Sequence, residues 1–373
     1  MNKQRLIDTL LTLVQINSES GDERLIADYL VRELSALGIA AEEDNTQIET
    51  GYGAGNIIAR VQGTVDVEPI CFMVHMDTVK PGNNVKPSIV DDYIITDGTT
   101  ILGADDKAGI AALIEMIRVI KEDKIEHGDI EIIITVGEET GLVGAKAFDT
   151  SKIKSKFGYA IDAPGLVGTV VTQAPTQSKI DIEVFGKTAH AGVAPELGVS
   201  AIEIAARAIA NMKLGRIDDE TTANIGSISG GEATNVVTDH VVMKAEARSL
   251  VMEKLDAQVE HMRTVFVETA AEMGGEVKFV DENSYAPINV SPEREVVTTA
   301  VEAIENIGRT PELISLGGGS DGNVFAEKGI ETIILGLGYE EIHTKNERMP
   351  ISELVAITEL LVELIQVQAK KGL

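Results

Sequence analysis

Short, almost purely apolar runs that alternate with amphipathic segments constrain the fold of this chain more than any other feature. The apolar runs have the length and the β-branched content of buried strands, and they occupy residues 56–61, 70–74, 130–136 and 157–162. The segments with helical spacing occupy residues 2–15, 22–37 and 105–123. Strands that are apolar on both faces are typical of a parallel sheet covered by helices. The sequence therefore predicts an α/β architecture, with a mostly parallel sheet and helices on both faces.

The pattern changes near residue 176. Residues 178–186 alternate between polar and apolar side chains, as a half-buried strand does. The order of elements that follows is β-α-β-β-α-β, which is that of an α+β, ferredoxin-like sandwich. The α/β pattern returns with a helix at 293–306 and ends with a helix at 351–370. We therefore expect a discontinuous larger domain, 1–175 and 288–373, interrupted by an inserted domain, 176–287.

Charge and cysteine content limit the classes of partner and compartment. The 373 residues carry a formal charge of −28, which argues against nucleic acid or an anionic membrane surface as a partner. Cys71 is the single cysteine and lies in an apolar run, so we expect an inert buried thiol and a reducing compartment. The N-terminal segment reads as an amphipathic helix rather than a signal peptide, and no apolar run reaches the roughly 18–20 residues of a membrane span. These features favour a cytoplasmic protein.

Acidic and histidine side chains cluster where the predicted strands end. They are His75 and Asp77, Asp105 and Asp106, Glu138 and Glu139, Asp162, and His343. A single acid at such a position is usually a helix cap or a turn residue, and Asp106 is read in this way. Capping does not readily explain five such points that converge on one edge of a sheet. Open α/β sheets bind their ligands at this edge, so a binding site is the better explanation. The other histidines, which lie in turns or on a charged helix, are read as surface residues; they are His127, His240 and His261.

This combination of residues is typical of a metal-binding site. Histidine and carboxylate side chains together suit Zn²⁺, Co²⁺ or Mn²⁺. The adjacent Glu138 and Glu139 would repel each other at the end of a buried strand, whereas nearby dications remove that repulsion. One glutamate then binds metal while its neighbour acts as a general base.

The motifs "HMDTV", "GADDKAG", "GEETG", "IDAPG" and "IHTKNE" resemble, in this order, those of the M20 family of dinuclear zinc metallopeptidases. The likeness extends over essentially the whole chain and is strongest to the peptidase T-like (tripeptide aminopeptidase) branch. It implies two Zn²⁺ per chain, with Co²⁺ or Mn²⁺ as alternatives.

The resemblance also implies roles for the motif residues. His75 and Asp162 correspond to ligands of one metal, and Glu139 and His343 to ligands of the other. Asp105 corresponds to the bridging carboxylate, and the family has a cis peptide bond after it. Asp77 corresponds to the carboxylate that orients the first histidine, and Glu138 to the general base.

The insert resembles the family's lid domain. By this resemblance His190, in "GKTAHAGVAPELG", contacts the developing oxyanion of the scissile carbonyl. The same resemblance implies that Asn235 and Arg248 lie near the substrate carboxylate and that the glycine loop 316–323, with Gly318, lines the pocket. The resemblance also makes a homodimer through the lid domain an expectation.

The expected function is release of the N-terminal residue from short peptides, by attack of a metal-bridged water with Glu138 as general base. An N-acyl amino acid amidohydrolase or a carboxypeptidase with the same dinuclear site is the alternative. Asp162 favours aminopeptidase or dipeptidase action, since carboxypeptidase-like relatives often carry glutamate there. A catalytically silent binding protein is disfavoured because no motif residue is missing.

Overall fold

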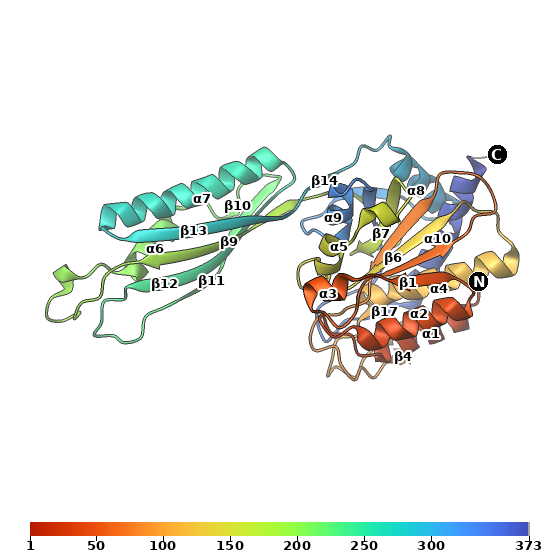
Figure 1. Ribbon diagram of the computed structural model, residues 1–373, viewed down its shortest axis with the longest axis horizontal. Helices are drawn as coiled ribbons and strands as arrows, with labels where there is room; N and C mark the ends of the chain where they lie inside the picture. The colour runs from red at the N-terminus through yellow and green to blue at the C-terminus, as the bar shows by residue number, and fades with distance from the viewer. Residues whose placement is uncertain (372–373) are drawn as a thin grey trace. The chain divides into compact units, whose positions relative to one another are not determined.

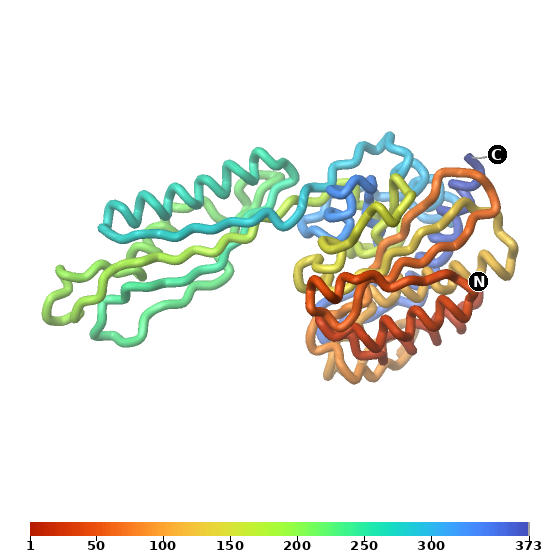
Figure 2. Tube along the Cα trace, viewed as in Figure 1, coloured from red at the N-terminus to blue at the C-terminus, as the bar shows by residue number. Residues whose placement is uncertain are grey.

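The computed structural model describes residues 1–371, which form two compact units. Unit 1 contains Met1–Gln173, Ile288–Leu316 and the chain from Ser320 onward, and unit 2 contains Ala174–Pro287 with Gly317–Gly319. In the tube of Figure 2, the red and blue ends of the chain both belong to unit 1, whereas the green to cyan segment makes up unit 2.

A nine-stranded mixed sheet forms the centre of unit 1, with strand order β1-β2-β6-β3-β7-β16-β8-β14 and with β15 also paired to β8 (Figure 1). The four central strands β6, β3, β7 and β16 are mutually parallel, whereas β1, β2 and the β16–β8 pair are antiparallel. The strands are β1 (Ala40–Glu43), β2 (Ile57–Val61), β3 (Ile70–His75), β6 (Ile130–Thr135), β7 (Phe157–Ala163), β8 (Thr169–Ala174), β14 (Ile288–Asn289), β15 (Glu312–Ser315) and β16 (Glu331–Gly336). The predicted parallel sheet is therefore confirmed for its centre, whereas the strand pairs outside the centre are antiparallel except for β15 with β8, which is parallel.

Helices cover both faces of this sheet, as predicted. The larger apolar core joins one face to five helices, which are α1 (Lys3–Gln15), α2 (Arg24–Ala36), α4 (Ala104–Asp123), α8 (Glu295–Asn306) and α10 (Ile351–Lys370). Shorter helices contribute to the rest of the unit: α3 (Thr46–Thr50), α5 (Val143–Ala147) and α9 (Asp321–Glu327). The rings of Phe148 and Phe325 pack edge to face between α5 and α9, with centroids 5.5 Å apart.

Strand alternation decides which residues reach the site. In β3, Phe72 and Val74 join the larger core, so His75 at the strand end belongs to the opposite set of side chains. In β7, Tyr159 and Ile161 join that core, and Asp162 belongs to the opposite set. The ends of neighbouring parallel strands thus bring these polar side chains together at one edge of the sheet.

Unit 2 is an antiparallel five-stranded sheet with two helices packed on it (Figure 1). Its strand order is β10-β11-β12-β9-β13, which gives the ferredoxin-like arrangement with one additional short strand. The elements are β9 (Thr176–Phe185), α6 (Ala201–Asn211), β10 (Gly215–Arg216), β11 (Thr221–Gly230), β12 (His240–Ser249), α7 (Met252–Met273) and β13 (Glu276–Tyr285). This unit has an apolar core of its own, which includes Ile182, Met243 and Phe266.

Several local features bear on the sequence predictions. A small sheet of β4 (Ser88–Val90), β5 (Tyr93–Ile95) and β17 (Met349–Pro350) was not predicted. Cys71 is fully buried, as expected. The surface prediction is confirmed for His240 but wrong for His127, which is 4% exposed. The glycine-flanked turn of His127 packs inward, and the ring bonds the carbonyl of Gly128 through Nδ1, at 2.7 Å.

His261, the third of these histidines, is half-buried, and its Nε2 accepts a hydrogen bond from the backbone of Lys213. Within residues 1–371, no helix is long and apolar enough to cross a lipid bilayer.

Substitution of Phe72 tests how much the packing of β3, the strand that ends in His75, contributes to the stability of unit 1. Its ring is fully buried and stacks on Tyr159, with centroids 5.9 Å apart. We expect Phe72→Ala to lower the free energy of unfolding of unit 1 by about 3–5 kcal/mol, because a large buried ring leaves a cavity. Denaturant unfolding measures this loss. Leu25→Ala, at a position 61% exposed, is the control and changes the free energy by less than about 0.5 kcal/mol.

Candidate metal centre

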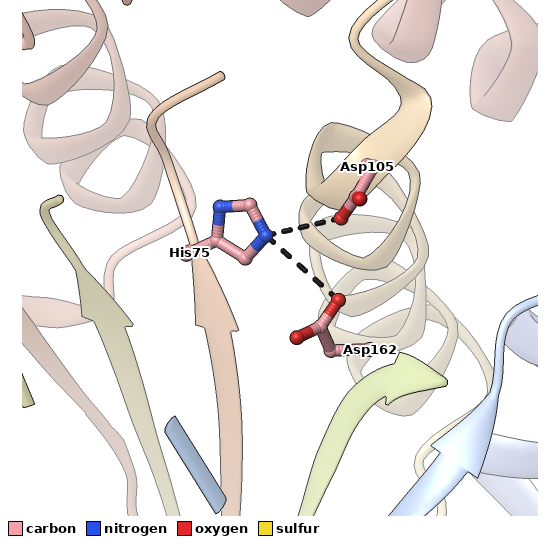
Figure 3. Close-up of side chains that lie close together, drawn as sticks. All are labelled: His75, Asp105 and Asp162. Carbon is pink, nitrogen blue, oxygen red and sulfur yellow. Dashed lines mark hydrogen bonds and ion pairs between the residues drawn. The ribbon is translucent and has the colours of Figure 1, made fainter. Parts of the chain in front are cut away.

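His75 ends β3 with its ring directed at two carboxylates. Its Nε2 lies 3.0 Å from Oδ1 of Asp105 and 3.8 Å from Oδ1 of Asp162. Figure 3 shows the ring with both carboxylates on the Nε2 side. On the other side of the ring, Nδ1 lies 3.0 Å from the backbone oxygen of Asp77 and 3.4 Å from its carboxylate. The ring is only 2% exposed. His75 is therefore held from behind while Nε2 faces the carboxylates.

Asp105 lies in the turn that begins α4. Asp105 and Asp106 have non-helical backbone angles, and the peptide bond between them is cis, as the resemblance implied. Asp106 was read as a helix N-terminal acid, and the structure buries it completely with Oδ2 accepting from the backbone N–H of His75 at 3.2 Å. Gly109 allows this packing, because a Cβ there would lie 2.4 Å from Oδ1 of Asp106.

The two glutamates follow β6 in a turn that Asp77 organises. The backbone N–H of Glu138 donates to Oδ1 of Asp77 at 3.0 Å, and that of Glu139 donates to Oδ2 at 3.3 Å. Ser20 also donates its hydroxyl to Oδ2, at 2.6 Å. Asp77 therefore fixes the position of both glutamates as well as contacting His75.

His343 lies in the loop after β16 and approaches the same carboxylates from another direction. Its Nε2 is 2.8 Å from Oε1 of Glu139 and 3.2 Å from Oδ2 of Asp105. Asp105 thus presents Oδ1 to His75 and Oδ2 to His343. One carboxylate consequently connects two histidines that are far apart in the sequence.

The crowding of these groups perturbs their pKa values. Burial and the neighbouring Asp105 raise the pKa of Asp162 to about 7. Burial and Asp162 hold the pKa of Glu138 well above its usual value. Hydrogen bonds to Asp105 and Glu139 raise the pKa of His343 to about 10. Burial lowers the pKa of His75, but its carboxylate neighbours more than offset this and hold that pKa well above the usual value.

The residues present fit a pair of metal ions. Three groups offer ligand atoms within 4.8 Å of one another: His75 with Asp105 and Asp162, His75 with Glu138 and Glu139, and Asp105 with Glu139 and His343. The donors are imidazole nitrogens and carboxylate oxygens, which suit divalent zinc, cobalt or manganese. Carboxylates that raise one another's pKa are those a dication stabilises. The cluster is therefore a candidate binding site for more than one ion.

The four residues predicted to bind substrate lie in unit 2 and do not form a single group there. His190 and Asn235 are neighbours, because the backbone N–H of Ala191 donates to the oxygen of Asn235 and His190 pairs with Val236. Arg248 and Gly318 are also close, since a Cβ on Gly318 would lie 3.9 Å from Nη1 of Arg248. Asn235 precedes β12, whereas Arg248 is close to its far end.

Sequence reasoning missed buried polar side chains that contact the cluster or interact with it electrostatically. Tyr339 donates its hydroxyl to Oδ1 of Asp162 at 3.2 Å. Asp321 is 6% exposed, accepts from Thr135 at 2.5 Å, and has its pKa raised to about 7 by burial. The signal for Asp321 was present in "GGGSDGN", which was interpreted only as a glycine loop. Glu347 lies in "IHTKNE", where only the histidine was considered.

Comparison of the chain with known proteins identifies the family to which it belongs. The model of peptidase family M20/M25/M40 matches residues 71–367. The chain belongs to this family, and the resemblance noted in the sequence is confirmed.

Relatives match nearly the full length of the chain. Aminopeptidase PepT from Bacillus cereus has a crystal structure that is 54% identical, covers 99% of both chains and superposes with a TM-score of 0.95. The structure of a tripeptidase from Staphylococcus aureus is 48% identical over 99% of both chains, with a TM-score of 0.97. The uncharacterized protein YqjE of Bacillus subtilis is 54% identical over 370 residues, which are 99% of this chain and 100% of that protein.

Metal binding should release protons. The pKa of His343 in the metal-free protein is about 10, well above the roughly 6.5 of a free imidazole, so this side chain is protonated at pH 7 and must lose its proton to bind metal. We expect roughly one or more protons to be released per chain at pH 7, and the metal affinity to fall as the pH is lowered. Calorimetric titration with Zn²⁺ in buffers of different ionisation enthalpy measures the release.

The stability of the metal-free protein should depend on pH in the opposite direction to its metal affinity. The ion pairs of protonated His343 stabilise the fold fully below pH 6.5, and that stabilisation is lost as the pH rises through about 10.

The control for the proton-release measurement is His240→Gln. His240 pairs with Glu183 in unit 2, so this substitution should leave the number of protons released on metal binding unchanged. A binding enthalpy that does not depend on the buffer would contradict this prediction.

Proposed function

We propose that this protein is a metal-dependent aminopeptidase of the M20 family that releases the N-terminal residue from short peptides. The observation that carries the proposal is the arrangement around Asp105, whose two oxygens face His75 and His343 while Glu138 stands beside them. The two crystal structures that match over 99% of the chain are named aminopeptidase and tripeptidase, which supports peptides as the substrate class.

The ligands divide into two sets that share one carboxylate. His75 and Asp162 would hold one ion, Glu139 and His343 would hold the other, and Asp105 would bridge them. The mixed nitrogen and oxygen donors favour two Zn²⁺, with Co²⁺ or Mn²⁺ as substitutes. When bound, such ions polarise the scissile carbonyl and make an attacking water more acidic.

Glu138 is the general base in this proposal. Its raised pKa, caused by burial and by Asp162, gives it the proton affinity needed to take a proton from the attacking water and pass it to the leaving amine. Asp77 holds the backbone of Glu138 at 3.0 Å, so that the base stays beside the ligand set. Tyr339 donates to Asp162 and orients that carboxylate.

The roles proposed for unit 2 rest on the family resemblance. His190 would stabilise the oxyanion, Asn235 and Arg248 would bind the substrate carboxylate, and Gly318 would line the pocket. Arg248 now pairs with Glu246 and bonds the carbonyl of Gly317, so it would exchange these partners to bind substrate. The same resemblance supports a homodimer through unit 2, and the single buried cysteine supports a cytoplasmic location.

Replacement of the base separates catalysis from metal binding. We expect Glu138→Gln to lower kcat by about 10²–10⁴-fold, because the amide cannot accept the proton, while the metal content stays the same. Turnover of a tripeptide and elemental analysis of the same sample measure both quantities. Glu139→Gln is the matched comparison, and it should lose metal together with activity. Full activity of Glu138→Gln would refute the proposed role.

A panel of substrates decides between this function and the alternatives that share the site. The proposal predicts cleavage of a tripeptide with a free amino group, loss of activity after chelation, and recovery with Zn²⁺. Cleavage of only an N-acetyl amino acid would identify an amidohydrolase. Release of the C-terminal residue from the tripeptide would identify a carboxypeptidase.

A further inference from the structure

Glu347 is a buried carboxylate close to the metal ligands that the proposed mechanism does not use. It follows His343 by four residues and is 1% exposed. The loop that carries His343 is closed at its base by a backbone pair between Glu340 and Arg348, with N–O distances of 2.9 and 3.1 Å. The side chains of that pair also form an ion pair. Glu347 therefore starts from the fixed base of the loop.

The carboxylate of Glu347 binds the turn that carries Asp105. Its Oε2 accepts from the backbone N–H groups of Leu102 and Gly103, both at 2.8 Å. Its Oε1 accepts from the backbone N–H of Asp105 itself, at 3.2 Å. Because Asp105 and Asp106 are not helical, these N–H groups belong to a non-helical turn before the regular part of α4 and depend on a side chain for a partner.

We propose that Glu347 is a positioning residue that sets the distance between Asp105 and His343, and through it the affinity for the metal ion these two residues share. The inference rests on the proposed function, because it needs the dinuclear site. Glu347 would not bind the ion. It joins two segments more than 240 residues apart in the chain, and each segment supplies one ligand.

A carboxylate is needed here because all three of its partners are donors. A glutamine at the same position has one oxygen and one NH₂ group, so one orientation places a donor against Asp105 and the other places it against Leu102 and Gly103. Either orientation leaves a buried N–H opposite another N–H and pushes the turn away from Glu347. The displaced turn moves Asp105 relative to His343, and outer partners of metal ligands commonly change metal affinity by about 10–100-fold.

Glu131 offers a matched control within the same unit. It is 2% exposed, and its carboxylate accepts from the backbone N–H groups of Lys154 and Ser155, both at 2.9 Å, and from the Ser155 hydroxyl at 2.7 Å. It lies near the start of β6, at the opposite end of the strand from the glutamates of the site. Glu131→Gln therefore makes the same chemical change in a similarly buried cluster that carries no metal ligand.

The test is titration of the full-length metal-free protein with Co²⁺, followed by visible absorption, for the wild type, Glu347→Gln and Glu131→Gln. We expect the wild type to bind two ions, and Glu347→Gln to bind one of them about 10–100-fold more weakly. Glu131→Gln should keep both metal affinities, even if its thermal stability falls as much as that of Glu347→Gln. Saturating Co²⁺ should restore much of the kcat of Glu347→Gln, which a general loss of stability would not allow.

Any one of the following results would overturn the inference. The first is a Glu347→Gln protein with both wild-type affinities, and the second is an equal loss of affinity in Glu131→Gln. The third is a wild-type protein that binds no Co²⁺, which would refute the proposed function as well. This result is distinguishable from the first two because it is observed in the unsubstituted protein. Where Glu347→Gln does not fold, Glu347→Asp replaces it, since the shorter side chain keeps the carboxyl group but withdraws it from its N–H donors. Wild-type affinity of that variant would also overturn the inference.

Discussion

Electrostatic repulsion among carboxylates at one edge of the central sheet is the constraint on which the rest of unit 1 depends. Asp105, Glu138 and Asp162 are brought together by the ends of different elements, and each raises the cost of ionising another. The protein offsets this repulsion with two histidines, His75 and His343, that share Asp105. Such an arrangement is costly without cations and favourable with them, so the fold and the metal site are energetically linked.

Asp77 connects the carboxylate cluster to the surrounding segments of unit 1. Its carboxylate accepts from the backbone of both glutamates and from Ser20, which belongs to the turn before α2. The N-terminal turn, the end of β3 and the turn after β6 are thus held by one side chain. Since the position of Glu138 depends on this side chain, Asp77 supports the proposed base as directly as it supports His75.

Much of this arrangement could be predicted from the sequence, because strand ends and ligand types are local signals. Apolar runs located the central strands, and the acids and histidines that follow them located His75, Glu139 and Asp162 at one edge. The contacts of Asp77 with Glu138 and Glu139 could not be predicted in this way. They depend on the register of neighbouring strands and on the path of two turns, which the local pattern does not specify.

Buried charged and polar residues of unit 1 were the hardest to predict. Lys107 is fully buried and donates to the carbonyl of Ile16 at 2.9 Å, although lysine is rarely found in a protein interior. Glu347 and Tyr339 act through contacts with segments distant in the chain, so their neighbours in the sequence give no indication of their partners. His127 was misread for a related reason, because turn composition does not reveal which turns pack against the body of the unit.

The measurement that tests the central claim most directly is anomalous X-ray diffraction at the zinc absorption edge from crystals of the zinc-loaded protein. The account predicts two anomalous peaks about 3.5–4 Å apart with Asp105 between them, one peak beside His75 and the other beside His343. A single peak, or two peaks that do not share Asp105, would contradict the account.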